Sequence, residues 1–368
     1  MLRLVKIVFS LLALLSFTGA SCQEAITPHM AYNLNFQRGA VIPEYSSFLY
    51  LTEENVYSLE ASFEKGLSDA NPWNRIYGQP SIGASLFFTT LGNDEVHGQE
   101  IAIYPYFLLP ISRSEKFETY ATIGLGLGYT TKIYDPEENP LNVVVGSHIN
   151  VHFQTKLGMR FRLSEKFFLD GGVALAHLSN ANTAEPNIGI NNGTYFLGLH
   201  YRISQKPIET LMSPNLDLDK SPFYEIAVAP GFKSTRALKA STHFTFSVTG
   251  DVWKPLTHVV AIGIGPDIFY DGSAETELSI EEGSEYEPIM QWSTGLHLSV
   301  SFRYDRLRLI LQGGVYVGLP NEVEDELIYN RGMVRYDVTD QFIAYFAMKS
   351  HLHILDHPEF GLGYRFGK

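Results

Sequence analysis

Residues 148–163 read His-Ile-Asn-Val-His-Phe-Gln-Thr-Lys-Leu-Gly-Met-Arg-Phe-Arg-Leu, and two kinds of side chain alternate along them. The odd positions are apolar apart from one Thr, whereas the even positions carry His, Asn, Gln, Lys, Gly or Arg. Side chains two residues apart lie on the same face of a β-strand. The segment therefore predicts a strand with one apolar and one polar face, longer than most strands of soluble proteins.

The same alternation recurs along the chain and predicts an all-β protein. Residues 120–130, 194–204 and 307–319 each place small or polar side chains on one face and Leu, Val, Phe or Tyr on the other. A soluble sandwich would also alternate, but it would bury the apolar face of each strand. The long strands with Tyr-rich ends favour an antiparallel transmembrane β-barrel, whose apolar face meets lipid and whose polar face lines a lumen.

The composition excludes several other classes. The 368 residues are 45% hydrophobic, 13% aromatic and 18% charged, with one Cys and a formal net charge of −13. Disordered chains lack this many aromatic residues, and a disulfide scaffold needs more than one Cys. Nucleic-acid binders normally carry a basic surplus. We therefore expect no nucleic-acid partner.

Residues 1–22 have the pattern of a cleavable secretory signal. Arg3 and Lys6 precede an apolar stretch at residues 7–17 that is too short to span a bilayer, and small residues lead to Cys22. A lipoprotein would carry an aliphatic residue where Gly19 stands. Cleavage after Cys22 would leave a chain without a thiol, which excludes cysteine catalysis. We expect export to the cell outer membrane.

Strand-like segments fall into two groups, about eight before residue 205 and about eight after residue 222. Residues 205–221 contain two prolines and read as a linker. The ends of the groups are similar, with Ala-His-Leu-Ser at 176–179 and Ser-His-Leu-His at 350–353. We interpret the chain as a duplication, with domains at 23–204 and 222–368. It predicts two tandem eight-stranded barrels, or alternatively one barrel of about sixteen strands.

A polar pair marks the end of one apolar stripe. In residues 167–179 the odd positions are apolar or Gly until His177 and Ser179, which share that outward face. Two side chains so placed lie within hydrogen-bond reach, so the imidazole can take the proton of the hydroxyl. On that face the pair is well placed to contact an acyl chain that lies against the outer wall of the barrel. The alternative is an ordinary interfacial His and Ser near a loop.

The longer string resembles a known signature. His177-x-Ser179-Asn-Ala, followed by Pro-Asn-x-Gly-Ile at residues 186–190, resembles the motif of the lipid A 3-O-deacylases, which belong to the outer-membrane acyloxyacyl-hydrolase-like proteins. The resemblance implies an eight-stranded barrel whose lipid-facing His and Ser hydrolyse an ester-linked acyl chain of lipopolysaccharide. The motif covers residues 177–190, and the short single-barrel members have no counterpart of the second half.

The resemblance also implies roles for single residues. Ser179 would be the nucleophile and His177 the general base. Asn180, Asn187 and Gly189 would shape the loop beside the oxyanion or donate to it.

One position departs from the family, because Asn191 stands where an acidic residue would orient the His. Asn191 would then be a weaker orienter, Glu185 would take that part, or the site would be slow or inactive. In the second half, His351 and His353 stand where the first half has His177 and Ser179. We therefore expect the second half to be non-catalytic.

These observations predict an outer-membrane serine esterase that acts on lipid A or another acylated membrane lipid. The mechanism needs no metal or organic cofactor. The sequence leaves open whether the protein forms a homodimer. The alternatives are a phospholipase that uses the same site, or a non-catalytic barrel that acts as a pore, an adhesin or a structural protein.

Overall fold

The computed structural model describes residues 29–43, 51–52, 54–68, 70–180, 184, 186–205, 218–235, 241–279, 286–321, 323, 326–351 and 354–367. The predicted signal at 1–22, most of the linker at 205–221, Glu185 and His353 lie outside these residues. In the described part, no helix is both long and apolar enough to cross a membrane.

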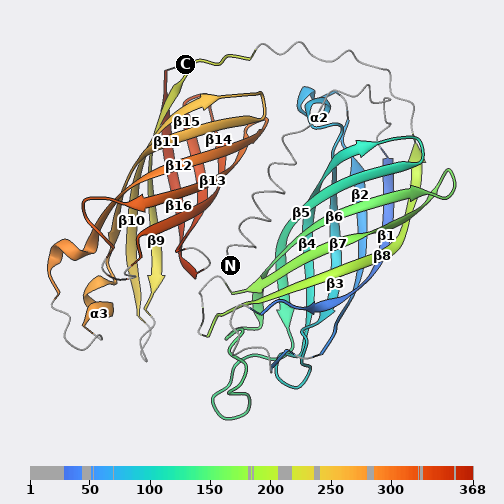
Figure 1. Cartoon of the computed structure of the whole chain (residues 1–368), viewed down its shortest axis with the longest axis horizontal. Coiled ribbons are helices and arrows are strands. Elements are labelled where there is room, and N and C mark those ends of the chain that lie inside the picture. Colours follow the sequence, from blue (N-terminus) through green and yellow to red (C-terminus); the bar gives the residue numbers. More distant parts are fainter. Residues whose placement is uncertain are drawn as a thin grey trace. The chain divides into compact units, whose positions relative to one another are not determined.

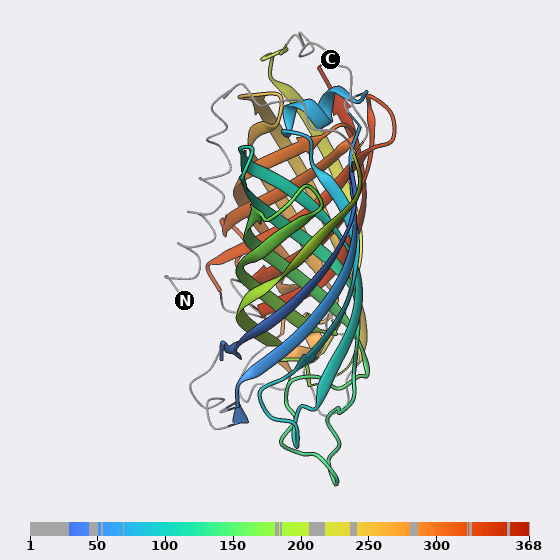
Figure 2. The ribbon, with the colours of Figure 1, turned by 90° about the vertical axis from the view of Figure 1, so that its right-hand side faces the viewer.

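The first half of the chain forms a closed antiparallel barrel of eight strands (Figure 1). Each strand pairs with the next in sequence, and β1 pairs with β8, so the sheet has no free edge. The strands are β1 (His29–Val41), β2 (Val56–Gly66), β3 (Ser81–Thr90), β4 (Gln99–Arg113), β5 (Phe117–Thr130), β6 (Ile149–Arg162), β7 (Phe167–Ser179) and β8 (Ile190–Gln205). Figure 2 shows them running obliquely, as barrel closure requires.

The second half forms another closed barrel of eight antiparallel strands, in which β9 pairs with β16. Its strands are β9 (Phe223–Ser234), β10 (Thr242–Pro255), β11 (Val260–Asp271), β12 (Trp292–Tyr304), β13 (Leu307–Tyr316), β14 (Ile328–Asp337), β15 (Phe342–His351) and β16 (Ile354–Phe366). The short helices α3 (Ala274–Leu278) and η2 (Pro288–Gln291) lie between β11 and β12. The prediction of two tandem barrels is confirmed, and the alternative of one wide barrel is wrong.

Two short turns and the longer connection 67–80 lie at one end of the first barrel, and four connections lie at the other. The turns 114–116 and 163–166 are short, and they lie at the end that also carries helix α2 (Pro72–Ile76). The connections 42–55, 91–98, 131–148 and 180–189 lie at the other end. Outer-membrane barrels place short turns in the periplasm and longer loops outside the cell. We call the end with the four connections the loop end.

Apolar side chains cover the outside of both barrels. Burial alternates along the strands, so every second residue faces out, and many large apolar side chains are more than half exposed. Examples from both barrels are Leu34, Phe36, Leu127, Leu197, Leu298 and Leu362. Soluble monomers rarely expose apolar patches of this extent. The surface is that of a transmembrane barrel.

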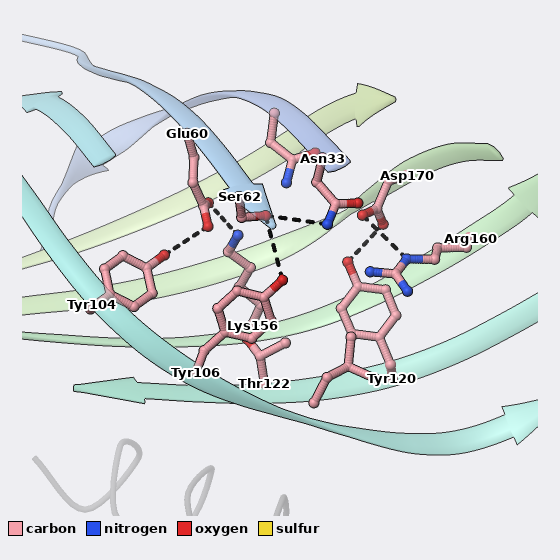
Figure 3. Close-up of a pocket in the computed structure, with 12 residues that line it drawn as sticks. Asn33, Glu60, Ser62, Tyr104, Tyr106, Tyr120, Thr122, Lys156, Arg160 and Asp170 are labelled. Carbon is pink, nitrogen blue, oxygen red and sulfur yellow. Dashed lines mark hydrogen bonds and ion pairs between the residues drawn. The ribbon is translucent and has the colours of Figure 1, made fainter. Parts of the chain in front are cut away.

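The interior of the first barrel is packed with paired polar groups (Figure 3). Glu60 forms an ion pair with Lys156 and accepts a hydrogen bond from the Tyr104 hydroxyl at 2.7 Å. Arg160 Nη2 lies 2.6 Å from Glu64 Oε2. These side chains line or border a small polar cavity. Because buried charges need partners, the network satisfies groups that the polar strand faces bring inside. A packed core of this kind disfavours a pore.

The second barrel has a denser network of the same kind. Glu225 lies at its centre and accepts from Arg308 Nη2 at 2.7 Å, from Arg335 Nη1 at 2.8 Å and from Arg365 Nε at 2.8 Å. All four side chains are buried. A single carboxylate therefore neutralises part of the charge of three guanidinium groups from different strands.

Replacing Glu225 by Ala should destabilise the second barrel, because it leaves buried guanidinium groups without their shared partner. Removing one member of a buried ion pair typically costs about 3–5 kcal/mol. Urea unfolding of the protein in detergent, followed by heat-dependent gel mobility, measures the loss. Asp340→Ala removes an exposed carboxylate in a turn and serves as the control. Equal unfolding midpoints for the two variants would contradict this account.

Candidate functional site

Strand β7 carries two polar side chains at the loop end of its outer face. Its residues are alternately exposed and buried, and His177 and Ser179 continue the face of Val173 and Leu175. Both are half-buried, whereas Leu178 between them points inward and is buried. The strand thus presents an imidazole and a hydroxyl on a largely apolar surface.

Three side chains form a continuous chain of hydrogen bonds on this surface. His177 Nε2 lies 3.0 Å from Ser179 Oγ, and His177 Nδ1 lies 2.8 Å from Asn191 Oδ1. The amide oxygen only accepts, so Nδ1 carries the proton. Nε2 is then the unprotonated nitrogen, which accepts from the hydroxyl of Ser179. His177 and Asn191 face each other in the β7–β8 ladder, which fixes their contact.

The two other predicted amides brace the loop between β7 and β8. The backbone N–H of Asn180 donates to Asn187 Oδ1 at 2.8 Å, and Asn180 Nδ2 donates to the carbonyl of Ala184 at 2.6 Å. Asn180 is buried. These bonds fix the course of the chain just after Ser179, while a direct contact of either amide with an oxyanion stays a prediction.

Gly189 returns the loop to the strand in a conformation that favours glycine. Its φ is +75°, and a Cβ added there would lie 3.1 Å from His177 Cε1 and 3.3 Å from Ser179 Cβ. Its N–H donates to the carbonyl of Val144 at 2.9 Å. Glycine therefore serves both the backbone conformation and the close approach to the catalytic candidates, while its N–H is bound by another loop.

That other loop, residues 131–148, packs behind the site. Val144 and Val145 are buried in an apolar cluster with Leu178 of β7 and Ile190 of β8. We call it the loop-end cluster, and its buried members are Val41, Leu51, Val56, Leu91, Val144, Val145, Leu178 and Ile190. It holds the two strands from inside while their outer faces carry the polar site.

A buried histidine supports the same loop. His97 contacts Asn142, whose Oδ1 accepts the backbone N–H of Val144 at 3.3 Å. His97 is almost fully buried, and burial lowers its pKa to about 4. The imidazole is therefore neutral at pH 7. Neither His97 nor Val144 was singled out from the sequence, although the run Val143-Val144-Val145 between two strands was a signal.

Two family models match the chain. Residues 57–202 match lipid A 3-O-deacylase (PagL), and residues 222–368 match the C-terminal domain of acyloxyacyl hydrolase. Together the matches span well over half of the chain. The first barrel matches the lipid A 3-O-deacylase family. The first match contains His177, Ser179 and Asn191, and the second covers the whole second barrel.

Several solved structures resemble parts of this chain. The outer membrane enzyme PagL is 17% identical with a TM-score of 0.33, and covers 45% of this chain and 97% of its own. Neisserial surface protein A is 10% identical with a TM-score of 0.34, and covers 47% and 97%. The N-terminal barrel of Pseudomonas aeruginosa OprF is 12% identical with a TM-score of 0.30, and covers 48% and 99%. At these scores none carries an argument about function. A comparison with curated proteins found no match.

The expected equivalence of His351 with His177 is wrong. His351 is buried inside the second barrel, where its Nε2 lies 2.8 Å from the hydroxyl of Tyr316, whereas His177 faces outward. His351 therefore takes the opposite face of its strand from His177. The similar strings are offset by one residue, and an offset of one moves a side chain to the opposite face.

Gly189→Ala should distort the site more than it destabilises the fold. Gly318→Ala is the matched control, because Gly318 has a φ of +89° in a loop of the other barrel. Each substitution should cost about 1 kcal/mol in unfolding free energy. Labelling of Ser179 by a fluorophosphonate should slow about tenfold or more in Gly189→Ala alone, since small misplacements of reacting groups are costly. Equal labelling rates would contradict the role assigned to Gly189.

Acid should loosen the 131–148 loop through His97. Its pKa lies below the ordinary value of 6.5, so the neutral form is favoured in the folded loop. The stabilisation is complete above pH 6.5 and is lost as the pH falls towards 4, by about 3 kcal/mol at most. Hydrogen exchange of the loop, corrected for intrinsic rates, should show this loss, and His97→Phe should remove it. His258→Phe, in a turn of the other barrel, should respond as the wild type does.

Proposed function

We propose that this protein is an outer-membrane esterase that removes an ester-linked acyl chain from lipid A. Ser179 is the nucleophile, His177 the general base and Asn191 the group that orients the imidazole. The observation that carries the proposal is the hydrogen-bonded chain of these three side chains on the lipid-facing wall of a barrel that matches the lipid A 3-O-deacylase family.

The position of the site favours a membrane lipid as the substrate. A soluble ester would be bound in a closed pocket, whereas these side chains border apolar strand residues that face lipid. Asn191 borders a shallow apolar depression, lined by residues that include Val41, Ile42 and Ile188. The loop end of such a barrel meets the outer leaflet, which is where lipid A resides.

In the first half of the reaction, the ester is cleaved and the enzyme is acylated. Ser179 Oγ attacks the ester carbonyl while His177 Nε2 takes its proton. Asn191 holds the proton of Nδ1 in place, which keeps Nε2 directed at the hydroxyl. Collapse of the tetrahedral intermediate breaks the bond to the sugar oxygen, and this oxygen receives the proton from His177.

In the second half, water releases the fatty acid. His177 takes a proton from the water, the resulting hydroxide attacks the acyl carbon, and Ser179 leaves with the proton returned by His177. Asn191 stabilises the imidazolium less than a carboxylate would, because it carries no charge. We therefore expect a slower enzyme than one with an acidic residue at this position.

Ser179→Ala should abolish the deacylation. Mass spectrometry of lipid A from cells that express the wild type should show the loss of one ester-linked chain, and the variant should leave lipid A intact. Ser350→Ala removes a half-buried Ser from the outer face of β15 and should behave as the wild type. A change in glycerophospholipids instead would indicate a phospholipase, and unchanged lipids would indicate a non-catalytic barrel.

Substitutions at Asn191 should change kcat and leave KM nearly unchanged. Asn191→Ala removes the acceptor that holds the imidazole, so kcat should fall about 100-fold or more. Asn191→Asp supplies a charge for the imidazolium and should match or exceed the wild type. Steady-state hydrolysis of lipid A in detergent measures both. A kcat unchanged in Asn191→Ala would show that Asn191 does not orient His177.

A further inference from the structure

A charged side chain lies on the lipid-facing wall near the site. Arg38 of β1 is exposed and points outward, on the face of Leu34 and Phe36. Among the described strand residues of the first barrel that face outward, the charged ones are Arg38 and Lys65. Lys65 lies at the end opposite the loop end, so Arg38 is the one near the site. A cation on a lipid-facing surface is unfavourable unless it meets an anion or water.

Two tyrosines flank this arginine in one row across three strands. Arg38 faces Tyr57 of β2 on one side and Tyr195 of β8 on the other. Both tyrosines are exposed on the same outer face, and the guanidinium carbon lies 5.7 Å from the centre of the Tyr57 ring. In the described part of the chain, no carboxylate forms an ion pair with Arg38. The row thus offers five N–H groups and two phenolic hydroxyls towards the membrane interface.

The row is close enough to the site to contact the same lipid. Tyr195 and Asn191 lie on the same face of β8, and Asn191 faces His177 in the ladder. Arg38 is level with Val173, so it lies two strands across and four residues along the sheet from His177, a separation of about 16 Å at the usual strand dimensions. Arg38 also lies only three residues from the end of β1, so its long side chain can reach the interface.

We propose that Arg38, with the hydroxyls of Tyr57 and Tyr195, binds a phosphate group carried by the substrate lipid. A guanidinium binds phosphate through two parallel hydrogen bonds, and tyrosines at the interface add hydroxyl donors. The bound phosphate fixes the head group beside β1, so that the ester carbonyl of the same lipid lies across β8 at Ser179. This inference rests on the proposed function, since it assigns the determinant of substrate choice at that site.

Kinetics with and without the phosphate test this assignment. Purified protein in detergent is given lipid A, the same lipid A after removal of its phosphates, and an uncharged p-nitrophenyl acyl ester. Arg38→Gln should raise KM for lipid A about tenfold with kcat unchanged, and it should match the wild type on the other two substrates. Lys65→Gln removes an outward-facing charge at the opposite end and should match the wild type on all three.

Other outcomes would overturn the assignment. An equal KM for lipid A in Arg38→Gln and the wild type would do so, as would an equal loss on dephosphorylated lipid A. Inorganic phosphate at the concentration of the lipid should not compete, and competition would assign the site to free phosphate instead.

A binding measurement separates this inference from the proposed function. Calorimetric titration of lipid A into Ser179→Ala and into Ser179→Ala/Arg38→Gln should give about tenfold weaker binding in the double variant, and equal binding of the dephosphorylated lipid. If the wild type cleaves no ester, the proposed function fails, while this titration still decides the phosphate site. Equal affinities of the two variants for lipid A would refute it.

Discussion

The pairing register between β7 and β8 is the constraint on which the site depends. His177 and Asn191 face each other in that ladder, and their side chains meet because both point outward there. A slip of one residue in either strand would turn one partner into the lumen. The site therefore needs no dedicated pocket. Closure of the barrel by β1 and β8 fixes the register, and the register brings the imidazole to the amide.

The inner faces of the same strands maintain that register. Leu178 and Ile190 belong to the loop-end cluster, so each alternates in sequence with a site residue but packs on the opposite side. The 131–148 loop supports the site through two contacts of Val144. Its side chain packs in the loop-end cluster, and its carbonyl accepts a hydrogen bond from the N–H of Gly189. Without this cluster, an outward-facing site would have lipid on its outer side and only water on the inner side of the strands. Packing inside the barrel mouth supplies the rigidity that a closed pocket gives to other enzymes.

Strand periodicity made most of the fold predictable from the sequence. The two-residue alternation fixes which face each side chain takes, and it led to two groups of strands and to the shared face of His177 and Ser179. The contact between His177 and Asn191 could be predicted only from the resemblance to the family motif, because it depends on the pairing register of two strands that are separated by a loop. The inward position of His351 was missed, since a matching string of letters does not reveal an offset of one residue. The part played by Val144 was missed because long loops have no periodicity to read.

The second barrel has the same scaffold but, among the described residues, lacks the arrangement that forms the candidate site on the first. Its interior is held by buried ion pairs, as that of the first barrel is. What differs is the end of β15, whose terminal His points inward, and the connection that follows. Only positions 352 and 353 separate β15 from β16, whereas residues 180–189 separate β7 from β8. A connection of two residues is too short to include a segment such as Asn187–Gly189, which lies next to His177 and Ser179. The candidate site combines an outward-facing pair with a returning loop, and among the described residues the first barrel alone has both.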